Sequence, residues 1–369
     1  MKLRRVSAVA KKEIIQILRD PFSLALAFLM PVLLLFIFGY AITLDVDNLK
    51  TTVYDQDNSR ESREFLSEMV RSGYFTVVGY PSTPAEITPY LDKGIARIAI
   101  WIPYDFSKNL RTGKESQVQV LVDGSDSNTA TIGLAYVAAV ADLFTQRMSP
   151  TRRLPPIEPR LRVWYNSELK SRNFIIPGLV AVIMGIIAAL LTSLTIAREW
   201  ERGTMEQLVS TPIKKTELLL GKLIPYFLIG LIDVAISVII GIFLFGVPFR
   251  GSVVLLFLIS SIFLFGGLSF GILISVATKS QLLASQVAMV TSYLPAFLLS
   301  GFMFSIANMP QPLQLMTRII PARYFVSLIK DIFLKANPLK FLAFDTLLLS
   351  VFGILAFAMA NRKFKKKII

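Results

Sequence analysis

Residues 174–197 read FIIPGLVAVIMGIIAALLTSLTIA, a run of 24 residues without a charge. A helix rises about 1.5 Å per residue and the hydrocarbon layer of a bilayer is about 30 Å thick, so about 20 residues cross it. The run therefore predicts a membrane-spanning helix. Directly after it, residues 198–212 read REWERGTMEQLVSTP, a short charged segment that leads into further apolar sequence.

Similar apolar runs occur along the rest of the chain and predict an α-helical polytopic membrane protein. The long run 280–317 is interpreted as one span from about residue 282 to 304, followed by a re-entrant or interfacial segment. We therefore predict six transmembrane helices. The other four runs are 22–42, 223–249 (interrupted by Asp233), 251–278 and 341–361 (interrupted by Asp345).

The composition excludes most enzyme classes. Of the 369 residues, 17% are charged, against about 25% in soluble domains. The chain has no Cys and no His, which removes thiolate nucleophiles, Cys/His zinc sites and histidine acid–base catalysis. It also lacks the G-x-x-x-x-G-K-[ST] phosphate-binding motif. We expect no enzyme activity, no catalytic, cofactor-binding or metal-binding residue, and no nucleic-acid partner.

Residues 43–173 predict a folded α/β domain inserted between the first and second spans. Its 16 acidic and 16 basic residues balance, so the net charge of +14 lies elsewhere. β-Branched and aromatic runs alternate with helical stretches, which favours a small mixed sheet covered by helices. Strands are expected at 51–54, 74–78, 96–102 and 117–122, and helices at 59–71, 84–93, 104–111 and 128–148.

Basic residues near the span ends predict the orientation. Residues 1–21 hold six Lys and Arg against two acids, and the tail 362–369 holds five basic residues and no acid. Both termini are therefore expected in the cytoplasm, and 43–173 on the extracytoplasmic side. The expected extracytoplasmic segment 305–340 fits poorly, because it contains Arg318, Arg323, Lys330, Lys335 and Lys340.

Two segments outside the spans are candidates for function. Residues 3–18 within the region 1–21 predict a basic amphipathic helix on the inner membrane face, with Leu3, Val6, Ala10, Ile14 and Ile17 as its apolar stripe. In the segment 198–212, Thr204 and Gln207 have capping-box spacing and Pro212 ends a helix of about two turns. Its charges surround Met205, Leu208 and Val209, so it either docks into a partner's groove or lies on lipid headgroups.

Asp233 falls near the middle of the third span. An unpaired carboxylate there costs at least about 2.5–3.5 kcal/mol, so it should face protein or water. It is either a proton- or cation-binding group in the translocation path, or the partner of a Ser or Tyr on another span. Asp345 lies nearer a span end and can reach the interface.

The loop also carries a family resemblance. The sequence REWERGTMEQL at 198–208, with TPI at 211–213 and ELLLGK at 217–222, resembles the signature of ABC-2-type transporter permeases. Resemblance to the drug-exporting branch, which has a large extracytoplasmic domain, extends over the whole chain. It includes Arg19-Asp20-Pro21, GVPFRG at 246–251, Met309-Pro310 and the segment 320–325.

The resemblance implies that residues 198–211 are the coupling helix on which a separate cytoplasmic ATPase subunit, holding ATP and Mg²⁺, is seated. It further implies a multi-pass protein of the bacterial inner membrane, with a second permease chain (identical or paralogous), membrane lipid and a periplasmic adaptor as partners. Since the spans offer apolar lining and few charges, the expected cargo is amphipathic and drug-like or lipid-like. The ATPase-coupling residues are then Arg198, Glu199, Glu201, Arg202, Gly203, Thr204, Met205, Glu206 and Leu208.

Two other functions stay open. A membrane receptor or scaffold would use the 43–173 domain to bind a ligand, but it would not need the coupling signature. An ion-coupled secondary transporter would use Asp233, but the sequence shows no matched second intramembrane charge and no inverted halves.

Overall fold

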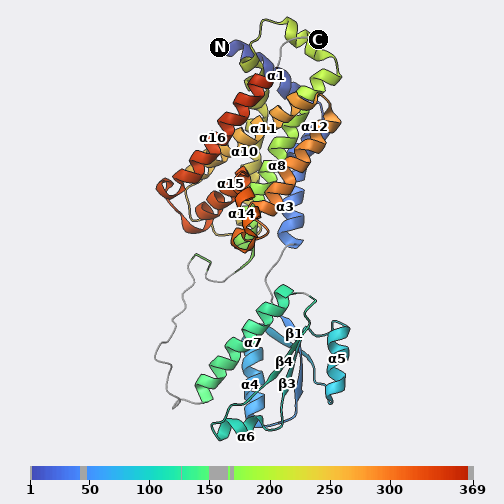
Figure 1. The fold of residues 1–369 in the computed structure, drawn as a ribbon, viewed down its shortest axis with the longest axis vertical. Coiled ribbons are helices and arrows are strands. Elements are labelled where there is room, and N and C mark those ends of the chain that lie inside the picture. The colour runs from blue at the N-terminus through green and yellow to red at the C-terminus, as the bar shows by residue number, and fades with distance from the viewer. Residues whose placement is uncertain (1, 42–47, 126, 149–164, 167–169, 365–369) are drawn as a thin grey trace. The chain divides into compact units, whose positions relative to one another are not determined.

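The computed structural model describes residues 2–41, 48–125, 127–148, 165–166 and 170–364, and the chain divides into two compact units. We call residues 1–43 with 163–369 the helical unit, and residues 44–162 the insert unit. The elements of each unit are labelled in Figure 1. The expected tail 362–369 lies largely outside the described residues.

The insert unit is a four-stranded sheet covered by helices. The strands are β1 (Leu49–Asp55), β2 (Phe75–Gly79), β3 (Ile98–Ile102) and β4 (Gln119–Val122), in the order β2-β1-β3-β4. β1 runs parallel to β2 and β3, whereas β4 is antiparallel to β3. The helices are α4 (Arg60–Arg71), α5 (Pro84–Asp92), α6 (Phe106–Arg111) and α7 (Ser127–Met148).

The insert core lies between the sheet and two helices. Val53 and Ile100 of the sheet pack with Phe65 of α4 and Val140 and Phe144 of α7, all buried. Figure 1 shows α4 and α7 on one face of the sheet and α5 on the other. An ion pair then ties α4 to α6: the Arg111 guanidinium donates to Glu61 and lowers the pKa of that carboxyl to about 2.

The helical unit begins with α1 (Leu3–Leu18), which is followed by a helix made of α2 (Pro21–Leu24), a π-helical turn (Ala25–Leu29) and α3 (Met30–Ala41). After the insert come α8 (Arg172–Glu201), the short α9 (Thr204–Ser210), α10 (Lys215–Phe243) and α11 (Val253–Thr278). One further long helix joins α12 (Gln281–Ala288), a π-helical turn (Met289–Tyr293) and α13 (Leu294–Leu299). The last elements are a 3₁₀ turn (Ile306–Asn308), α14 (Gln311–Thr317), α15 (Pro321–Lys330), a π-helical turn (Asp331–Lys335) and α16 (Leu339–Lys363).

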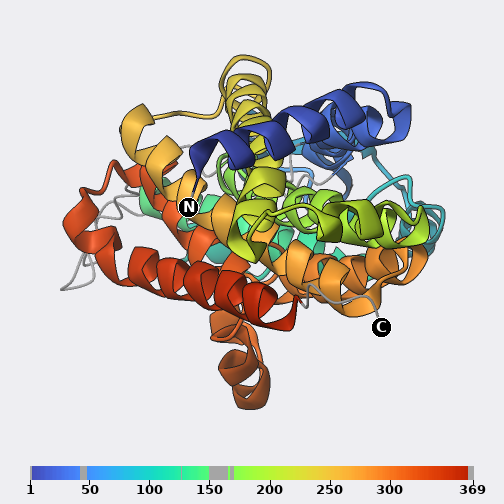
Figure 2. The same ribbon diagram turned by 90° about the horizontal axis from the view of Figure 1, so that it is seen from above.

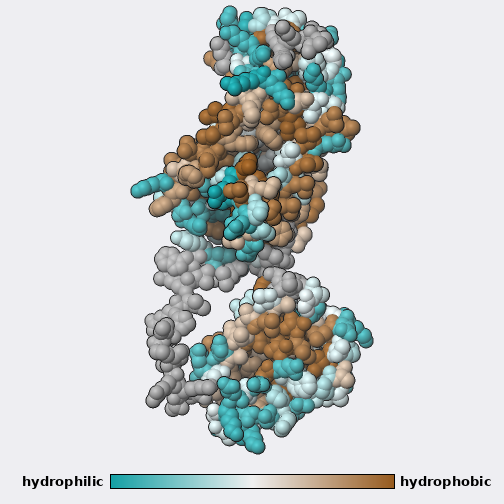
Figure 3. Space-filling view, viewed as in Figure 1, coloured by the Kyte–Doolittle hydropathy of each residue, from teal (hydrophilic) through white to brown (hydrophobic). Residues whose placement is uncertain are grey.

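Five helices in the described ranges are long and apolar enough to cross a membrane. They are α8, α10, α11, the helix 281–299 and α16. The expected first span corresponds to a shorter apolar helix of 17 residues, Ala25–Ala41, so the count of six remains a prediction. Figure 3 shows the surface that these helices share, a brown apolar band over the middle of the helical unit with teal polar ends.

The centre of the helical unit is α8. In its apolar 18-residue stretch, 78% of the residues are buried, against 17% in the helix 281–299. α8 packs on α3, α10, α11, α12 and α15. Its contact with α11 is close because Gly271 has no side chain: a Cβ atom there would lie 2.1 Å from the hydroxyl of Thr192. Thr192 in turn donates to the carbonyl of Leu268, and the Ser275 hydroxyl accepts two backbone N–H groups of α8. These bonds hold α8 and α11 together.

The chain leaves the helical unit for the insert and returns to it at the same end. A Cβ atom on Gly39, close to the end of α3, would lie 3.1 Å from Ile176, close to the start of α8. Helix α1 and the C-terminal end of α16 lie at the opposite end, as Figures 1 and 2 show. The segment 305–340 folds as short helices, of which α15 buries Phe325, Leu328 and Ile329 in the core.

Candidate coupling site

The candidate site is the end of the helical unit formed by α1, the last turn of α8, helix α9 and the first turns of α10. Helix α9 begins after Gly203, whose φ of +69° belongs to the left-handed region that glycine adopts without strain. This residue lets the chain reverse between α8 and α9. The predicted capping box is wrong, because Thr204 is already inside the helix and its hydroxyl donates to the carboxylate of Glu199.

Helix α9 presents charges outward and apolar side chains inward. Glu206 is exposed, as are Glu201, Arg202 and Gly203 before the helix. Met205 is 1% exposed and belongs to the core of the helical unit, and the partly buried Leu208 packs against that core. The hypothesis that Met205 inserts into a partner's groove is therefore wrong. The apolar side of α9 seats the helix on its own chain, since burial removes it from solvent.

Arg198 and Glu199, the first two residues of the predicted coupling segment, also point inward. Arg198 is 6% exposed and pairs with Asp20, its Nη1 lying 3.0 Å from the carboxylate oxygen. It also donates to the Ser23 hydroxyl at 3.2 Å and to the side chain of Gln281 at 3.3 Å. Arg198 therefore joins α8 to the helix after α1 and to the start of α12.

Glu201 reinforces the junction with α12. Its carboxylate accepts two hydrogen bonds from Gln281: one from the backbone N–H at 2.7 Å and one from the side-chain amide at 2.5 Å. A carboxylate at this position satisfies a backbone donor that the helix itself leaves free, and it interacts favourably with the helix dipole. The last turn of α8 thus caps α12, so the apolar helix 281–299 is tied to the segment 198–212.

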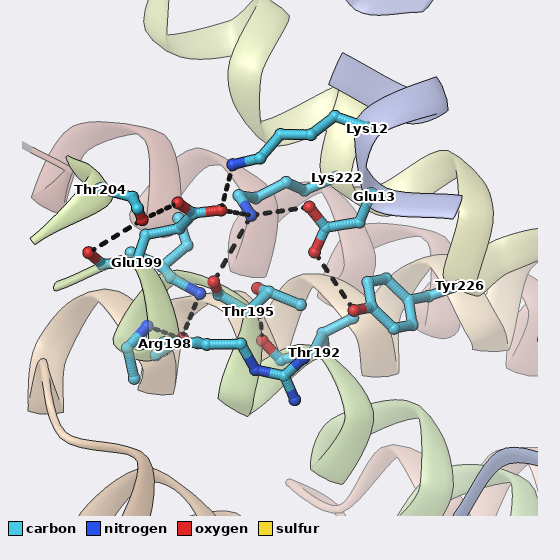
Figure 4. A network of polar contacts seen from close by, with 12 residues as sticks. Lys12, Glu13, Thr192, Thr195, Arg198, Glu199, Thr204, Lys222 and Tyr226 are labelled. Carbon is cyan, nitrogen blue, oxygen red and sulfur yellow. Dashed lines mark hydrogen bonds and ion pairs between the residues drawn. The ribbon is translucent and has the colours of Figure 1, made fainter. Parts of the chain in front are cut away.

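The centre of the site is a buried ion network of Lys12, Glu13, Glu199, Lys222 and Tyr226 (Figure 4). Lys222 Nζ lies 2.8 Å from a Glu13 carboxylate oxygen and 3.1 Å from one of Glu199, and all three residues are at most 2% exposed. Lys12, whose side chain is 44% exposed, pairs with Glu199 at 2.7 Å. The Tyr226 hydroxyl donates to Glu13 at 3.2 Å.

The ion network is charge-balanced and joins three helices that are far apart in the sequence. Two lysines face two glutamates, so no charge of the four is buried without an opposite one. α1 supplies Lys12 and Glu13, α8 supplies Glu199, and α10 supplies Lys222 and Tyr226. Since Glu199 also accepts from Thr204, the ion network continues directly into α9.

Glu217 fixes the other end of α1 on α10. Its buried carboxylate accepts the backbone N–H of Lys2 at 2.8 Å and that of Lys214 at 3.0 Å, and lies 3.6 Å from Arg5. The predicted helix 3–18 is present, but its buried face differs from the predicted stripe. Leu3 and Ile14 are 75% and 41% exposed, whereas Val9 and Glu13 are buried. Helix α1 therefore rests on α10 and turns part of its apolar stripe outward.

Asp233 lies apart from this site, on the same helix as Lys222 and Tyr226. It is 4% exposed, and among the described residues its Oδ2 has no hydrogen-bond partner. It lines a cavity of about 10 Å³ together with Tyr226 and Ser237 of its own helix and apolar residues of α8 and α11. That volume is near the lower limit for one water molecule. The structure thus brings Asp233 close to Tyr226 but to no other carboxylate of the predicted site.

Sequence reasoning missed Glu13, Lys222 and Tyr226 as site residues. A signal was present for Glu13, because it lies at helical spacing between Val9 and Ile17 on the face that the structure buries. Lys222 was noticed only as part of the run 217–222. A charged residue on a buried face is seldom left unpaired. Glu13 and Lys222 therefore each require a partner, but the sequence does not indicate which residue that partner is.

The comparisons identify the class of protein that has this architecture. A family model for ABC-2 family transporter proteins matches residues 21–361, and the chain belongs to that family. The chain is 40% identical over 369 residues to the probable multidrug ABC transporter permease YbhS of Escherichia coli (strain K12). The match covers 99% of this chain and 98% of that protein. In the same strain, it is 32% identical to the probable multidrug ABC transporter permease YbhR (97% and 99% covered) and 27% identical to the inner membrane transport permease YhhJ (86% and 85% covered).

Proposed function

We propose that the chain is the permease subunit of an ATP-driven exporter that moves amphipathic drug-like or lipid-like molecules out of the cytoplasm or inner leaflet. Its membership of the ABC-2 family supports the transport role, and relatives named as multidrug permeases support the cargo class. The energy would come from a separate ATPase subunit that holds ATP and Mg²⁺. A second permease chain, identical or paralogous, would complete the transporter in a bacterial inner membrane.

The observation that carries the proposal is that α9 packs one face on its own chain and leaves a charged face exposed. Its outer face carries the exposed Glu206, with the exposed Arg202 just before the helix, while its inner face is fixed by Met205 and by the bond from Thr204 to Glu199. Charges at the rim of an interface select the partner and its register. A partner that pushes on this outer face would displace α9 and the last turn of α8 together.

The buried ion network gives this displacement a route into the helices. Glu199 is bonded to α9 on one side and to Lys222 on the other, and Lys222 is bonded to Glu13. Since these contacts are buried and charge-paired, α1, α8 and α10 would move as one body at this end. Such rigid-body motion about an interface is a common form of conformational switching.

The proposal also fixes an orientation. Both termini and α9 would lie in the cytoplasm, with residues 43–173 on the extracytoplasmic side, because the basic residues cluster at the chain ends. The apolar side chains exposed along the helix 281–299 would face lipid or the second permease chain. They include Leu282, Leu283, Met289, Val290 and Leu294, which are 46–67% exposed.

The test is charge reversal on the outer face of α9. Glu206→Lys should reduce co-purification of the ATPase and its stimulated hydrolysis rate, with a loss that depends on salt concentration because exposed charges are screened. The matched control is Glu115→Lys, the same change at an exposed position of the insert unit. Full coupling in both variants would remove α9 as the docking site.

A receptor or scaffold would give a different result. Such a protein would show no ATPase stimulation in the wild type, whatever residue stands at 206. An ion-coupled transporter would likewise work without the ATPase and would depend on Asp233. Both alternatives are therefore distinguished by the wild-type measurement before any variant is made.

A further inference from the structure

A second site lies at the end of the helical unit opposite α9. A partly open cavity of about 630 Å³ is lined by α15, the turn 300–307 and the beginnings of α8 and α16. Phe174 of α8 and Asp345 of α16 both line it, and each lies within the first two turns of its helix. The volume falls within the range of about 300–1,000 Å³ that is typical of ligand sites.

The lining of this cavity is cationic. Arg318 and Arg323 contribute two positive charges and Asp345 one negative charge, and Lys330, whose pKa is lowered to about 7 by burial, adds a third positive charge when it is protonated. In the part of the chain that the structure describes, none of the three cations forms an ion pair with a carboxylate. The neighbouring acid Asp331 is paired instead with Lys335, at 2.6 Å. The cavity therefore has positive charge available for an anion.

Local hydrogen bonds hold two of these cations, Arg323 and Lys330, in place. The Arg323 guanidinium donates to the Thr317 hydroxyl, which fixes its direction. Lys330 donates to the carbonyl of Gly301 at 3.1 Å, and its Nζ lies 3.2 Å from the centre of the Phe174 ring. Gly301 has a φ of +79°, so the turn that supplies this carbonyl requires a conformation that favours glycine. Arg323 and Lys330 are thus held in position before any ligand arrives.

The edge of the cavity continues into an apolar surface on α16. Phe344 lines the cavity and is 68% exposed. Leu347, Val351 and Ile354 follow it at spacings of three, four and three residues and are 44–64% exposed. Residues at this spacing share one helix face. A charged cavity therefore opens beside an apolar stripe that runs along a helix long enough to cross the membrane.

We propose that this cavity binds the phosphate of an anionic phospholipid, with an acyl chain lying along Phe344, Leu347, Val351 and Ile354. Arginine and lysine form charge-assisted hydrogen bonds with phosphate oxygens, and basic pockets between membrane helices bind acidic headgroups. The start of α16 is also where a headgroup would lie beside a spanning helix. The site is independent of ATPase docking, since it involves none of the α9 residues.

The proposal also accounts for the charge pattern that orientation rules explain poorly. Three of the five basic residues in the segment 305–340 line this one cavity. Basic residues that bind a phosphate group have a local reason to lie at this end of the unit. Their presence there then says little about the side of the membrane on which the segment lies.

The experiment measures lipid affinity with the purified full-length chain in detergent. Phosphatidylglycerol is titrated and compared with phosphatidylcholine and with inorganic phosphate, using the thermal stability of the protein as the readout. Arg318→Gln is the main variant, because in the described structure its guanidinium donates no hydrogen bond and its loss should leave the fold intact. Lys340→Gln is the matched control: it is exposed near the same end but does not line the cavity.

Phosphatidylglycerol should stabilise the wild type more than phosphatidylcholine does. Arg318→Gln should weaken its affinity about tenfold or more, as expected for one charge-assisted bond, and Lys340→Gln should leave the affinity unchanged. Phe344→Ser should also weaken the affinity for the lipid. Equal losses in Arg318→Gln and Lys340→Gln would overturn the site in favour of general surface charge. Equal affinity for inorganic phosphate would overturn the lipid assignment in favour of a soluble anion.

Discussion

Replacing Lys222 by methionine tests whether the buried ion network holds α1, α8 and α10 together. The change leaves Glu13 and Glu199 buried, each 2% exposed, and among the described residues Lys12 is then the one cation paired with Glu199. Removing one partner of a buried ion pair costs about 3–5 kcal/mol, mostly because the other charge stays desolvated. We therefore expect a loss of that size in the free energy of unfolding.

The pairing can be isolated with a double-mutant cycle. In Glu13→Gln with Lys222→Met, the charge that the lysine neutralised is gone, and Glu199 keeps its pair with Lys12 at 2.7 Å. The double variant should therefore be more stable than Lys222→Met alone, with a coupling energy of about 1–3 kcal/mol. Lys12→Met is the matched control: its side chain is 44% exposed and Glu199 keeps its contact with Lys222, so the loss should be smaller than in Lys222→Met.

The assay is denaturant titration of the purified chain in mixed micelles, followed by tryptophan fluorescence. Trp200 lies next to Glu199 in the sequence and under Lys279, whose Nζ is 4.7 Å from the ring centre. If Lys222→Met proves no more destabilising than Lys12→Met, the buried network does not fasten these helices and the route proposed from α9 to α1 fails.

Three further outcomes follow from the structure. Single cysteines at the exposed positions Ser7 and Ser125 should differ towards an impermeant thiol reagent in intact cells, with labelling at Ser125 only; the reverse pattern would invert the proposed orientation. Asp233→Asn should lower transport at unchanged protein abundance if the carboxylate acts in the translocation path, whereas a parallel fall in abundance would assign it a structural role. Gly271→Ala should destabilise the α8–α11 contact by about 1–3 kcal/mol, seen as a lower melting temperature, because the added Cβ would meet Thr192; an unchanged melting temperature would contradict this close packing.

The sequence predicts the long apolar helices well because their signal is local. An uncharged run such as 174–197 has the length and composition of a spanning helix, and α8 covers it. The strands and helices of the insert unit also lie close to their expected ranges, since alternation of β-branched and helical stretches is a local pattern. The first span is less clear, because its helix contains a π-helical turn and its apolar part has 17 residues.

The direction in which a short helix faces is not a local property. In α9, the pattern of Met205 and Leu208 predicts an apolar side, but the same pattern serves a partner's groove or the chain's own core. Likewise, Glu13 and Lys222 are 209 residues apart, so neither position alone indicates the pair. Tertiary packing decides both cases, and the local residue pattern does not indicate which surface the apolar side chains will contact.

The charge balance of the ion network has a consequence for how the transporter would respond to voltage. A membrane potential acts on net charge, at about 2.3 kcal/mol per elementary charge per 100 mV. Lys12, Lys222, Glu13 and Glu199 sum to zero, and their contacts keep them within one body. Movement of these four side chains together through part of the field would transfer no net charge. The ion network itself should therefore add nothing to the voltage dependence of opening and closing, in contrast to the excess basic residues of segment 1–21.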